Sequence, residues 1–489
     1  MKKIIVALVG FSVANFAFSQ TIYSLDSLQK LAKENSKELA IAKLKTTQTQ
    51  YEKSAAFTKF LPEITIQGGY VRNFEELSLI SKDMLLPIGS LNGNQFSFTP
   101  DQINNPIEIR NGNIVLLDKN GQPFNPQTEP SKILWKEYAV IPKESLTFDT
   151  RNLFIASLNF IQPLFMGGKI IAYNKIARLK TDLSNYEADE CNENIEIFVE
   201  QLYWQIVSLV NKHDAIVSFI ELLNQTEKEL QILIETGISA PSERLNVAVK
   251  KDEAELNELQ ILNAILLSKM SLAQLCGIQL NNEIILKDEG LENLHSVPQE
   301  RVSLDSIISR RWEIKKLTTV GDIQKQKERI ERSALLPSIS FIGTYTGTNP
   351  AINNGFQKHF SFDWHLGILV NIPLLHWGEN IYSLKAAKCE SNITRLRLEE
   401  AKEKINLQAE QSYLRLTESW RKLQMTEINL ERAGENLKAA NEGFREGVIP
   451  ASSLMEAQTA WVKARAERID AEIEIKINEM NYKKVTGRL

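Results

Sequence analysis

The chain has 489 residues, of which 43% are hydrophobic and 24% are charged, and its formal net charge is −4. This slightly acidic balance offers no basic footprint for nucleic acid, so we expect no nucleic-acid partner. Three widely separated cysteines, an odd number, exclude a disulfide framework. We expect Cys191, Cys276 and Cys389 to be small, buried helix residues.

The first 19 residues have the pattern of a secretory signal peptide. Lys2 and Lys3 precede an apolar run from Ile4 to Phe18, and Ala17-Phe18-Ser19 supplies a cleavage site. The run is shorter than the ~20 residues of a spanning helix, so a membrane anchor is the weaker alternative. No other segment has a comparable uninterrupted apolar run. We therefore expect an exported protein without a spanning helix, either a soluble protein or a β-barrel.

The mature chain is predicted to be a duplication. Ser24-Leu25-Asp26-Ser27 recurs as Ser303-Leu304-Asp305-Ser306, and each copy resembles the capped start of a helix. Leu61-Pro62 recurs as Leu336-Pro337. An ordered series of such matches is not expected by chance, and it divides the chain into repeats at 20–300 and 301–489.

Two strands are predicted in each repeat. After the Leu-Pro pairs, alternate residues match in kind, namely Ile64, Ile66, Gly68 and Tyr70 with Ile339, Phe341, Gly343 and Tyr345. This period of two is typical of a strand with one apolar face. In the second strand Phe154, Ala156, Leu158 and Phe160 alternate with Ser157 and Asn159. Residues 74–145 lie between the two strands and are rich in proline and Asn-Gly turns, which indicates an inserted loop or small cap.

The rest of each repeat is predicted to be a long helical hairpin. No proline or glycine interrupts Lys169–Glu235, which as a helix would be about 100 Å long at about 1.5 Å per residue. Glycine suits the turns at Gly237-Ile238 and Gly447-Val448, because it alone adopts positive φ without cost. The expected elements are strands at about 62–74 and 146–165 with a hairpin at 169–276, then strands at about 337–349 and 359–376 with a hairpin at 379–486.

Strands of about ten residues are long enough to cross a bilayer. Four strands cannot close a barrel, and an open edge in hydrocarbon leaves backbone groups unpaired at a cost of several kcal/mol each. The sequence therefore predicts an α+β membrane protein in which a helix-strand-strand-long-helix-hairpin unit is duplicated. Each chain would give four β-strands to a barrel that is shared between copies. The strand count alone is compatible with two, three or four copies.

The chain resembles the TolC-like outer-membrane efflux protein family over nearly its whole mature length. The resemblance lies in the duplicated Leu-Pro, the strand-to-helix junctions at Gln162–Lys169 and Ile372–Gly378, and the hairpin turn at 446–448 with the helix start at 453–458. It implies a homotrimer with a 12-stranded β-barrel in the outer membrane and a long α-helical periplasmic tunnel. Such a channel is the exit duct of an efflux pump or a type I secretion system.

The resemblance also implies partners and site residues. A periplasmic adaptor and an inner-membrane transporter would engage the hairpin turns at Gly237, Ile238, Gly447 and Val448. In the family, acidic residues beyond the second hairpin form a ring that narrows the tip. Candidates here are Glu456, which matches one ring position, Ser453, which occupies the other, and Glu243, which aligns with Ser453 in the first hairpin. Pro163, Gly168, Pro373 and Gly378 mark the strand–helix junctions. An ordinary solvated helix residue remains an alternative for Glu456.

No catalytic, metal or cofactor motif is present, so we expect no enzyme. Met166-Gly167-Gly168-Lys169-Ile170 lacks the hydroxyl residue and upstream glycine of a phosphate loop. His359, His365 and His376 cluster only loosely, which is not typical of a metal site. The alternative from another class is a periplasmic helical adaptor or scaffold that never enters the bilayer. The insertion at 74–145 is expected to face outward and cover the barrel mouth.

Overall fold

A computed structural model describes residues 22–280 except 89, 93, 94 and 98, then residues 283–290 and 300–488. The expected signal peptide at 1–19 lies outside the described residues. The chain forms two compact units, and each draws segments from both sequence repeats. The helical unit combines the described residues of Met1–Thr58, Gly167–Leu336 and Pro373–Leu489, and the strand unit combines Lys59–Met166 with Pro337–Ile372.

The helices of the two repeats have matching lengths. α2 (Lys37–Thr58) and α6 (Trp312–Ser333) have 22 residues each, α3 (Lys169–Glu235) and α7 (Glu379–Arg445) have 67, and α4 (Pro241–Cys276) and α8 (Ala451–Thr486) have 36. Two shorter helices, α1 (Leu25–Asn35) and α5 (Leu304–Arg310), begin the repeats. For the three longer helices of each repeat, the duplicated sequence pattern therefore corresponds to equal lengths, whereas α1 has 11 residues and α5 has 7.

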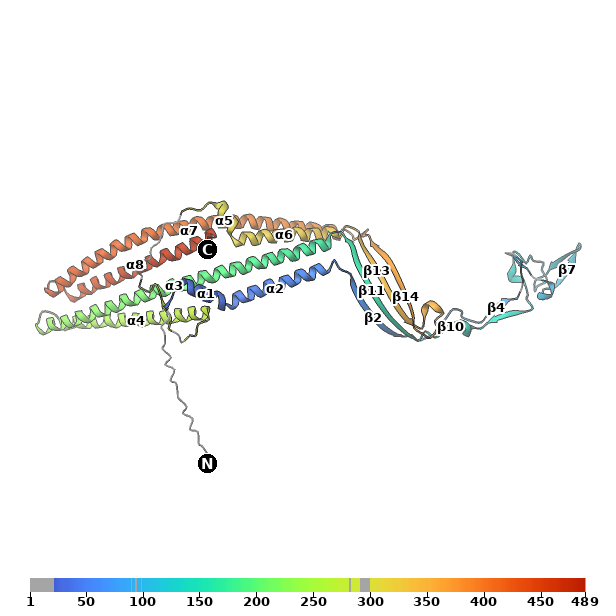
Figure 1. The fold of residues 1–489 in the computed structure, drawn as a ribbon, viewed down its shortest axis with the longest axis horizontal. Coiled ribbons are helices and arrows are strands. Elements are labelled where there is room, and N and C mark those ends of the chain that lie inside the picture. The colour runs from blue at the N-terminus through green and yellow to red at the C-terminus, as the bar shows by residue number, and fades with distance from the viewer. Residues whose placement is uncertain are drawn as a thin grey trace, which may run out of the picture. The chain divides into compact units, whose positions relative to one another are not determined.

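In each repeat the 67-residue helix packs along both the 22-residue helix and the 36-residue helix of that repeat (Figure 1). α2 follows the first part of α3, where Asn174 donates to the carbonyl of Ala56 at 2.8 Å and the hydroxyls of Thr46 and Ser184 lie 3.2 Å apart. α4 returns along the second part of α3. The same arrangement holds for α6 and α8 along α7. Most of the length of each long helix is therefore supported by a neighbour, which a single exposed helix would lack.

Three apolar clusters form the core of the helical unit, and the smallest of them contains Ile307, Ile314, Ile405 and Ala409. The middle core includes Leu28, Ala32, Val199, Tyr203, Ile206, Leu272, Cys276 and Leu286, and a short parallel pair, β1 (Ile22–Tyr23) with β12 (Ile285–Leu286), borders it. The tip core joins the two hairpins through Phe219, Leu223, Leu230, Val247, Leu437, Phe444 and Leu454. Cys276 is buried and Cys191 half-buried, but Cys389 is exposed. The prediction of three buried cysteines is therefore wrong for Cys389.

The strand unit contains a four-stranded antiparallel sheet in the order β14-β13-β11-β2 (Figure 1). Its strands are β2 (Glu63–Arg72), β11 (Asn152–Met166), β13 (Ser338–Asn349) and β14 (Ser361–Asn371). β11 begins later than the expected 146, because Thr147–Phe148 forms a separate short strand, β10. β14 ends before the expected 376, and Pro373, which has no N–H to donate, follows soon after that end. β2 and β14 are the edge strands.

The insertion between β2 and β11 has more structure than a loop. Its short antiparallel pairs are β3 (Leu77–Ser78) with β10, β4 (Met84–Pro87) with β9 (Tyr138–Ile141), β5 (Ser90–Asn92) with β6 (Gln95–Ser97), and β7 (Ile107–Arg110) with β8 (Asn113–Leu116). A small core contains Ile103, Leu116, Phe124 and Ile133, with Trp135 packed against it. Strands of two to four residues are too short to give a periodic sequence signal, so the sequence predicted only a loop or cap.

Replacing Leu223 by alanine tests the tip core. Leu223 is fully buried on α3, so its loss should leave a cavity and destabilise the hairpins by about 2–5 kcal/mol. We expect a lower thermal midpoint in circular dichroism at 222 nm. Ile232→Ala on the same helix is the matched control, because Ile232 is exposed. An equal effect of both changes would contradict the packing described here.

Candidate functional sites

The two hairpin turns close in the same way. The N–H of Gly237 donates to Ile234 and that of Ile238 to Leu233, while Gly447 and Val448 make the equivalent bonds to Phe444 and Gly443. Both glycines have positive φ, 79° and 68°, which is the geometry of a Schellman motif. A Cβ on Gly447 would lie 3.7 Å from Cγ2 of Ile238, so the turns lie side by side.

The turns present exposed apolar side chains. Ile238 is 64% exposed and Val448 is 77% exposed. A side chain of this kind at the end of a long hairpin is available for contact with another protein. The expected adaptor-contacting residues thus lie together on one surface.

The three tip candidates have different environments. Glu243 accepts a hydrogen bond from the backbone N–H of Ala451 at 3.0 Å, so one of its carboxylate oxygens is engaged within the chain. Glu456 is exposed on α8, and Ser453 is half-buried one turn earlier.

Glu243 caps the second hairpin. The N-cap residue of α8 is Pro450, which makes no side-chain capping bond, so the first N–H groups of α8 need another acceptor. The carboxylate of Glu243 supplies one, and its negative charge also suits the positive end of the helix dipole. Sequence reasoning missed this role because residue 243 belongs to the other hairpin.

Several polar contacts connect the two hairpins above the turns. Arg445 contacts Glu229 at 3.0 Å, and Lys212 contacts Asp470 at 2.6 Å. Between these pairs, the amide of Gln458 donates to the hydroxyl of Thr226 at 2.9 Å, and both side chains are buried. In the part of the chain that the structure describes, Oε1 of Gln458 has no hydrogen-bond partner.

A groove lies between α3, α7 and α8 next to the Gln458 contact. Its volume is about 430 Å3, and its wall includes Glu229, Asn441, Glu442, Arg445 and Trp461. The mixture of charged and aromatic side chains suits a polar ligand or a partner helix rather than a small apolar molecule. The sequence analysis did not predict this groove, because its lining residues come from three helices that are far apart in the sequence.

The two strand–helix junctions share their backbone geometry. Gly168 and Gly378 are the N-cap residues of α3 and α7, and each has a φ of 84°. Gly167 also has positive φ, and a Cβ there would lie 2.8 Å from the carbonyl oxygen of Ser333, so this position requires glycine. Pro163 lies within β11 next to an irregularity in its pairing with β13, and Pro373 follows β14.

One face of the four-stranded sheet is apolar. Leu158 lies opposite Ile66 and Tyr345, and Tyr345 lies opposite Trp364. The other members of this apolar face include Ile64, Tyr70, Phe154, Phe160, Phe341, Leu366 and Ile368. The side chains that alternate with them cannot share this face, because successive strand residues point in opposite directions.

The middle of the opposite face is polar. Ser157 lies opposite Gln67 and Thr346, and Thr346 lies opposite Asp363. A second row contains Asn159, Thr65, Thr344 and His365. A sheet with one apolar and one hydroxyl-rich face is the pattern of a strand set between lipid and water.

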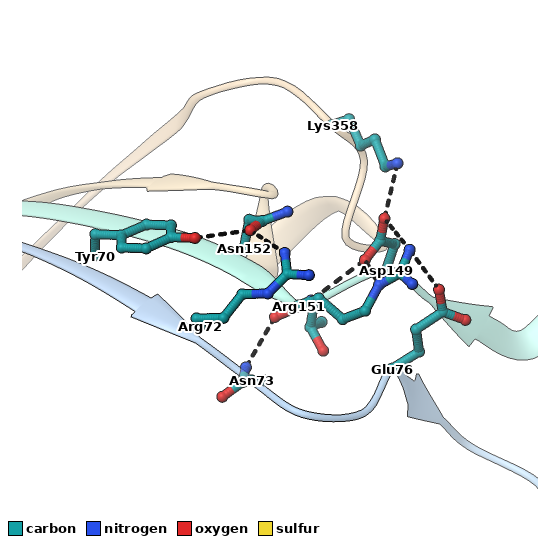
Figure 2. Close-up of polar contacts among 9 residues, drawn as sticks. Tyr70, Arg72, Asn73, Glu76, Asp149, Arg151, Asn152 and Lys358 are labelled. Carbon is teal, nitrogen blue, oxygen red and sulfur yellow. Dashed lines mark hydrogen bonds and ion pairs between the residues drawn. The ribbon is translucent and has the colours of Figure 1, made fainter.

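A polar network lies at the end of the sheet where the insertion begins (Figure 2). Asp149 accepts from the guanidinium of Arg151 at 2.8 Å and pairs with Lys358 at 2.9 Å. Arg151 also pairs with Glu76 at 2.9 Å. Hydrogen bonds from Arg151 and Lys358 hold the pKa of Asp149 well below its usual range. The network ties both arms of the insertion to the connection between β13 and β14.

Half-buried carboxylates occur along the helices. Burial raises the pKa of Glu193 and Glu200 on α3 and of Glu472 on α8. Because the folded-state pKa is raised, each group favours the folded state most at low pH, and this contribution is lost as the pH rises through the raised pKa. Lys316 pairs with Glu190 at 2.5 Å and offsets part of the acidic charge on α3. The indole N–H of Trp312 donates to Glu193 at 2.5 Å, which stabilises that carboxylate.

Within the described ranges, no three His, Cys, Asp or Glu side chains lie close enough to hold a metal ion. The same ranges contain one helix, α4, that is long and apolar enough to cross a membrane. Only 22% of its apolar stretch is buried in the chain. Polar residues such as Asn263, Ser268 and Lys269 lie among the apolar residues of α4, so this helix has no long uninterrupted apolar run in the sequence.

Replacing Glu243 by alanine tests the cap on α8. We expect a loss of about 1 kcal/mol of local stability, because an N–H at the helix start loses its acceptor. Hydrogen exchange at the first turn of α8 should accelerate, and Glu243→Gln should have an intermediate effect because it keeps an acceptor oxygen. Glu446→Ala, at the end of α7, is the matched control. Unchanged exchange in Glu243→Ala would refute the capping role.

Comparisons with known proteins give a family match for the second repeat and the fold of nearly the whole chain. Residues 309–488 match the family model "Outer membrane efflux protein". No curated protein matches the chain significantly. The solved structure of VceC from Vibrio cholerae matches with a TM-score of 0.69 at 12% identity, covering 95% of this chain and 96% of that one. The CmeC channel of Campylobacter jejuni matches with a TM-score of 0.69 at 14% identity, covering 95% and 85%.

CusC is a third similar structure, with a TM-score of 0.70 at 13% identity and coverage of 95% of this chain and 92% of that one. Its description concerns the formation of a transmembrane channel. At such low identity these likenesses establish the fold. The family match covers the second repeat, and the shared fold extends over nearly the whole chain. By sequence, residues 309–488 are similar to outer membrane efflux proteins, and by fold nearly the whole chain is similar to the solved structures of VceC, CmeC and CusC.

Proposed function

We propose that three copies of this chain form the exit duct of a multicomponent efflux pump or a type I secretion system. Together they would close a 12-stranded barrel in the outer membrane. The α3–α4 and α7–α8 hairpins would form the wall of a periplasmic tunnel. A periplasmic adaptor and an inner-membrane transporter would engage the turns at Ile238 and Val448. We infer transport rather than catalysis, since the family is one of channels.

The observation that carries this proposal is the sheet. Its apolar face suits lipid and the polar rows of its other face suit water. The edge strands β2 and β14 each need a partner in a bilayer, because no water is present there to satisfy the backbone. The antiparallel order β14-β13-β11-β2 lets β2 of one copy pair with β14 of the next, which continues the sheet around a ring.

The helices support the same assembly. α4 carries a row of exposed apolar side chains, which are Leu245, Val249, Leu256, Leu259, Leu266 and Leu267. α7 carries others, including Leu396, Leu407, Leu414 and Met425. Such extended apolar surfaces are unfavourable in water and favour contact between copies. A monomeric periplasmic scaffold, the alternative function, would leave these helices and the apolar face of the sheet exposed.

The first experiment concerns location and assembly. The protein expressed with its signal should fractionate to the outer membrane as a detergent-stable oligomer that dissociates on heating. Leu158→Arg should reduce insertion, because a charge on the lipid face near mid-bilayer costs about 2–4 kcal/mol. Ser157→Arg is the matched control on the polar face and should still insert. A soluble periplasmic monomer would favour the scaffold instead.

A second experiment concerns the tip. We propose that Glu456 from three copies forms an acidic ring that favours cations over anions. Glu456→Gln should reduce the cation selectivity of single channels in planar bilayers, and Ser453→Asp should increase it. Glu253→Gln, an exposed glutamate on α4, serves as the control. If selectivity is the same in all variants, Glu456 is an ordinary solvated residue.

A further inference from the structure

We propose that, at the mouth end of the sheet, the base of the insertion on one copy packs against the β13–β14 connection of the next copy. The contact joins two apolar patches that lie at opposite edges of the sheet. The insertion patch consists of Phe74, Leu77 and Leu79, and the connection patch consists of Ile352, Phe360 and Phe362. This inference rests on the proposed shared barrel and adds a contact beyond its strands.

The insertion patch follows the edge strand β2. Phe74 comes two residues after Arg72, the last residue of β2, and is 96% exposed. Leu77 and Leu79 are also exposed. Three large apolar side chains within six residues, next to an unpaired edge strand, form a surface that is unfavourable in water.

The connection patch lies at the start of the other edge strand, where Ile352 and Phe360 precede β14 and Phe362 is its second residue. Phe360 and Phe362 are 53% and 60% exposed, and their rings stack on each other at 6.5 Å. Phe362 is held in place, since its ring stacks on Tyr345 at 5.6 Å and covers Gly347, where a Cβ would lie 2.7 Å from it. The patch is therefore an ordered aromatic surface.

Strand direction brings the two patches to the same end of the barrel. β2 runs toward Arg72, and β14 runs away from Ser361, so both patches lie at the end of the sheet where the insertion begins. When β2 of one copy pairs antiparallel with β14 of the next, Phe74 of the first lies beside the segment before Ser361 of the second. A second copy of this chain is thus the occupant that the geometry supplies.

The other side of the insertion base is already occupied within the chain. Lys358 pairs with Asp149, and Phe356 packs on Phe148 with ring centroids 5.1 Å apart. Arg151 and Glu76 join the two arms of the base. The base is therefore held in position by its own connection, with the Phe74 side left open for the neighbour. Around the ring, insertion bases and connections would alternate.

Photo-crosslinking tests this contact. The photoreactive residue p-benzoylphenylalanine replaces Phe74 in the full-length chain, which is irradiated in outer membranes that contain tagged and untagged copies. We expect covalent dimers and trimers on denaturing gels, with the adduct mapped by mass spectrometry to residues 350–362 of a second copy. Phe360→Ser in the same background should cause loss of most of the adduct while the heat-labile oligomer persists.

The outcomes separate this inference from the proposed function. An intact oligomer whose probe reacts only within its own chain, with lipid or with another protein overturns the contact and leaves the duct in place. A monomer in unirradiated samples of the unmodified protein overturns both proposals. Placing the probe at Lys119, an exposed charged position of the insertion outside the patch, controls for random collision.

Discussion

The unpaired edges of the four-stranded sheet are the constraint on which the rest of this structure depends. Within the described part of the chain, β2 and β14 each present one edge that pairs with no other strand. In water such edges are a liability, and in a bilayer they are prohibitive. This constraint gives a physical reason for two proposals: the oligomer that would pair the edges, and the contact between copies through the apolar patches at the insertion end of the sheet.

In the helical unit the constraint is the stability of the long helices, and packing against neighbouring helices satisfies it. A helix of 67 residues is stable only when its length is packed against neighbours, and each long helix has two shorter helices along it. The exposed leucines of α4 are the surface that this packing leaves uncovered. Cross-hairpin contacts such as Gln458 with Thr226 then hold the two hairpins of one chain together near the tip.

Sequence reasoning succeeded where structure is local and repeated. The long helix predicted from Lys169 and the turn predicted at Gly237 follow from residue preferences over short distances. It failed where distant segments meet. The capping of α8 by Glu243 joins residues 208 positions apart, and the core around Ile103 depends on strands too short to be periodic. The exposure of Cys389 likewise depends on which side of α7 is covered.

The sequence by itself determined the duplication, the alternation that gives each strand an apolar face, and the glycine turns. Each of these patterns consists of residues that lie close together along the chain. Only the tertiary structure decided the strand order β14-β13-β11-β2, the network that ties Asp149 to Lys358, and the use of Glu243 as a cap. These features depend on which segments come together in space. Contact between two distant segments produces no periodic residue pattern in the sequence of either segment.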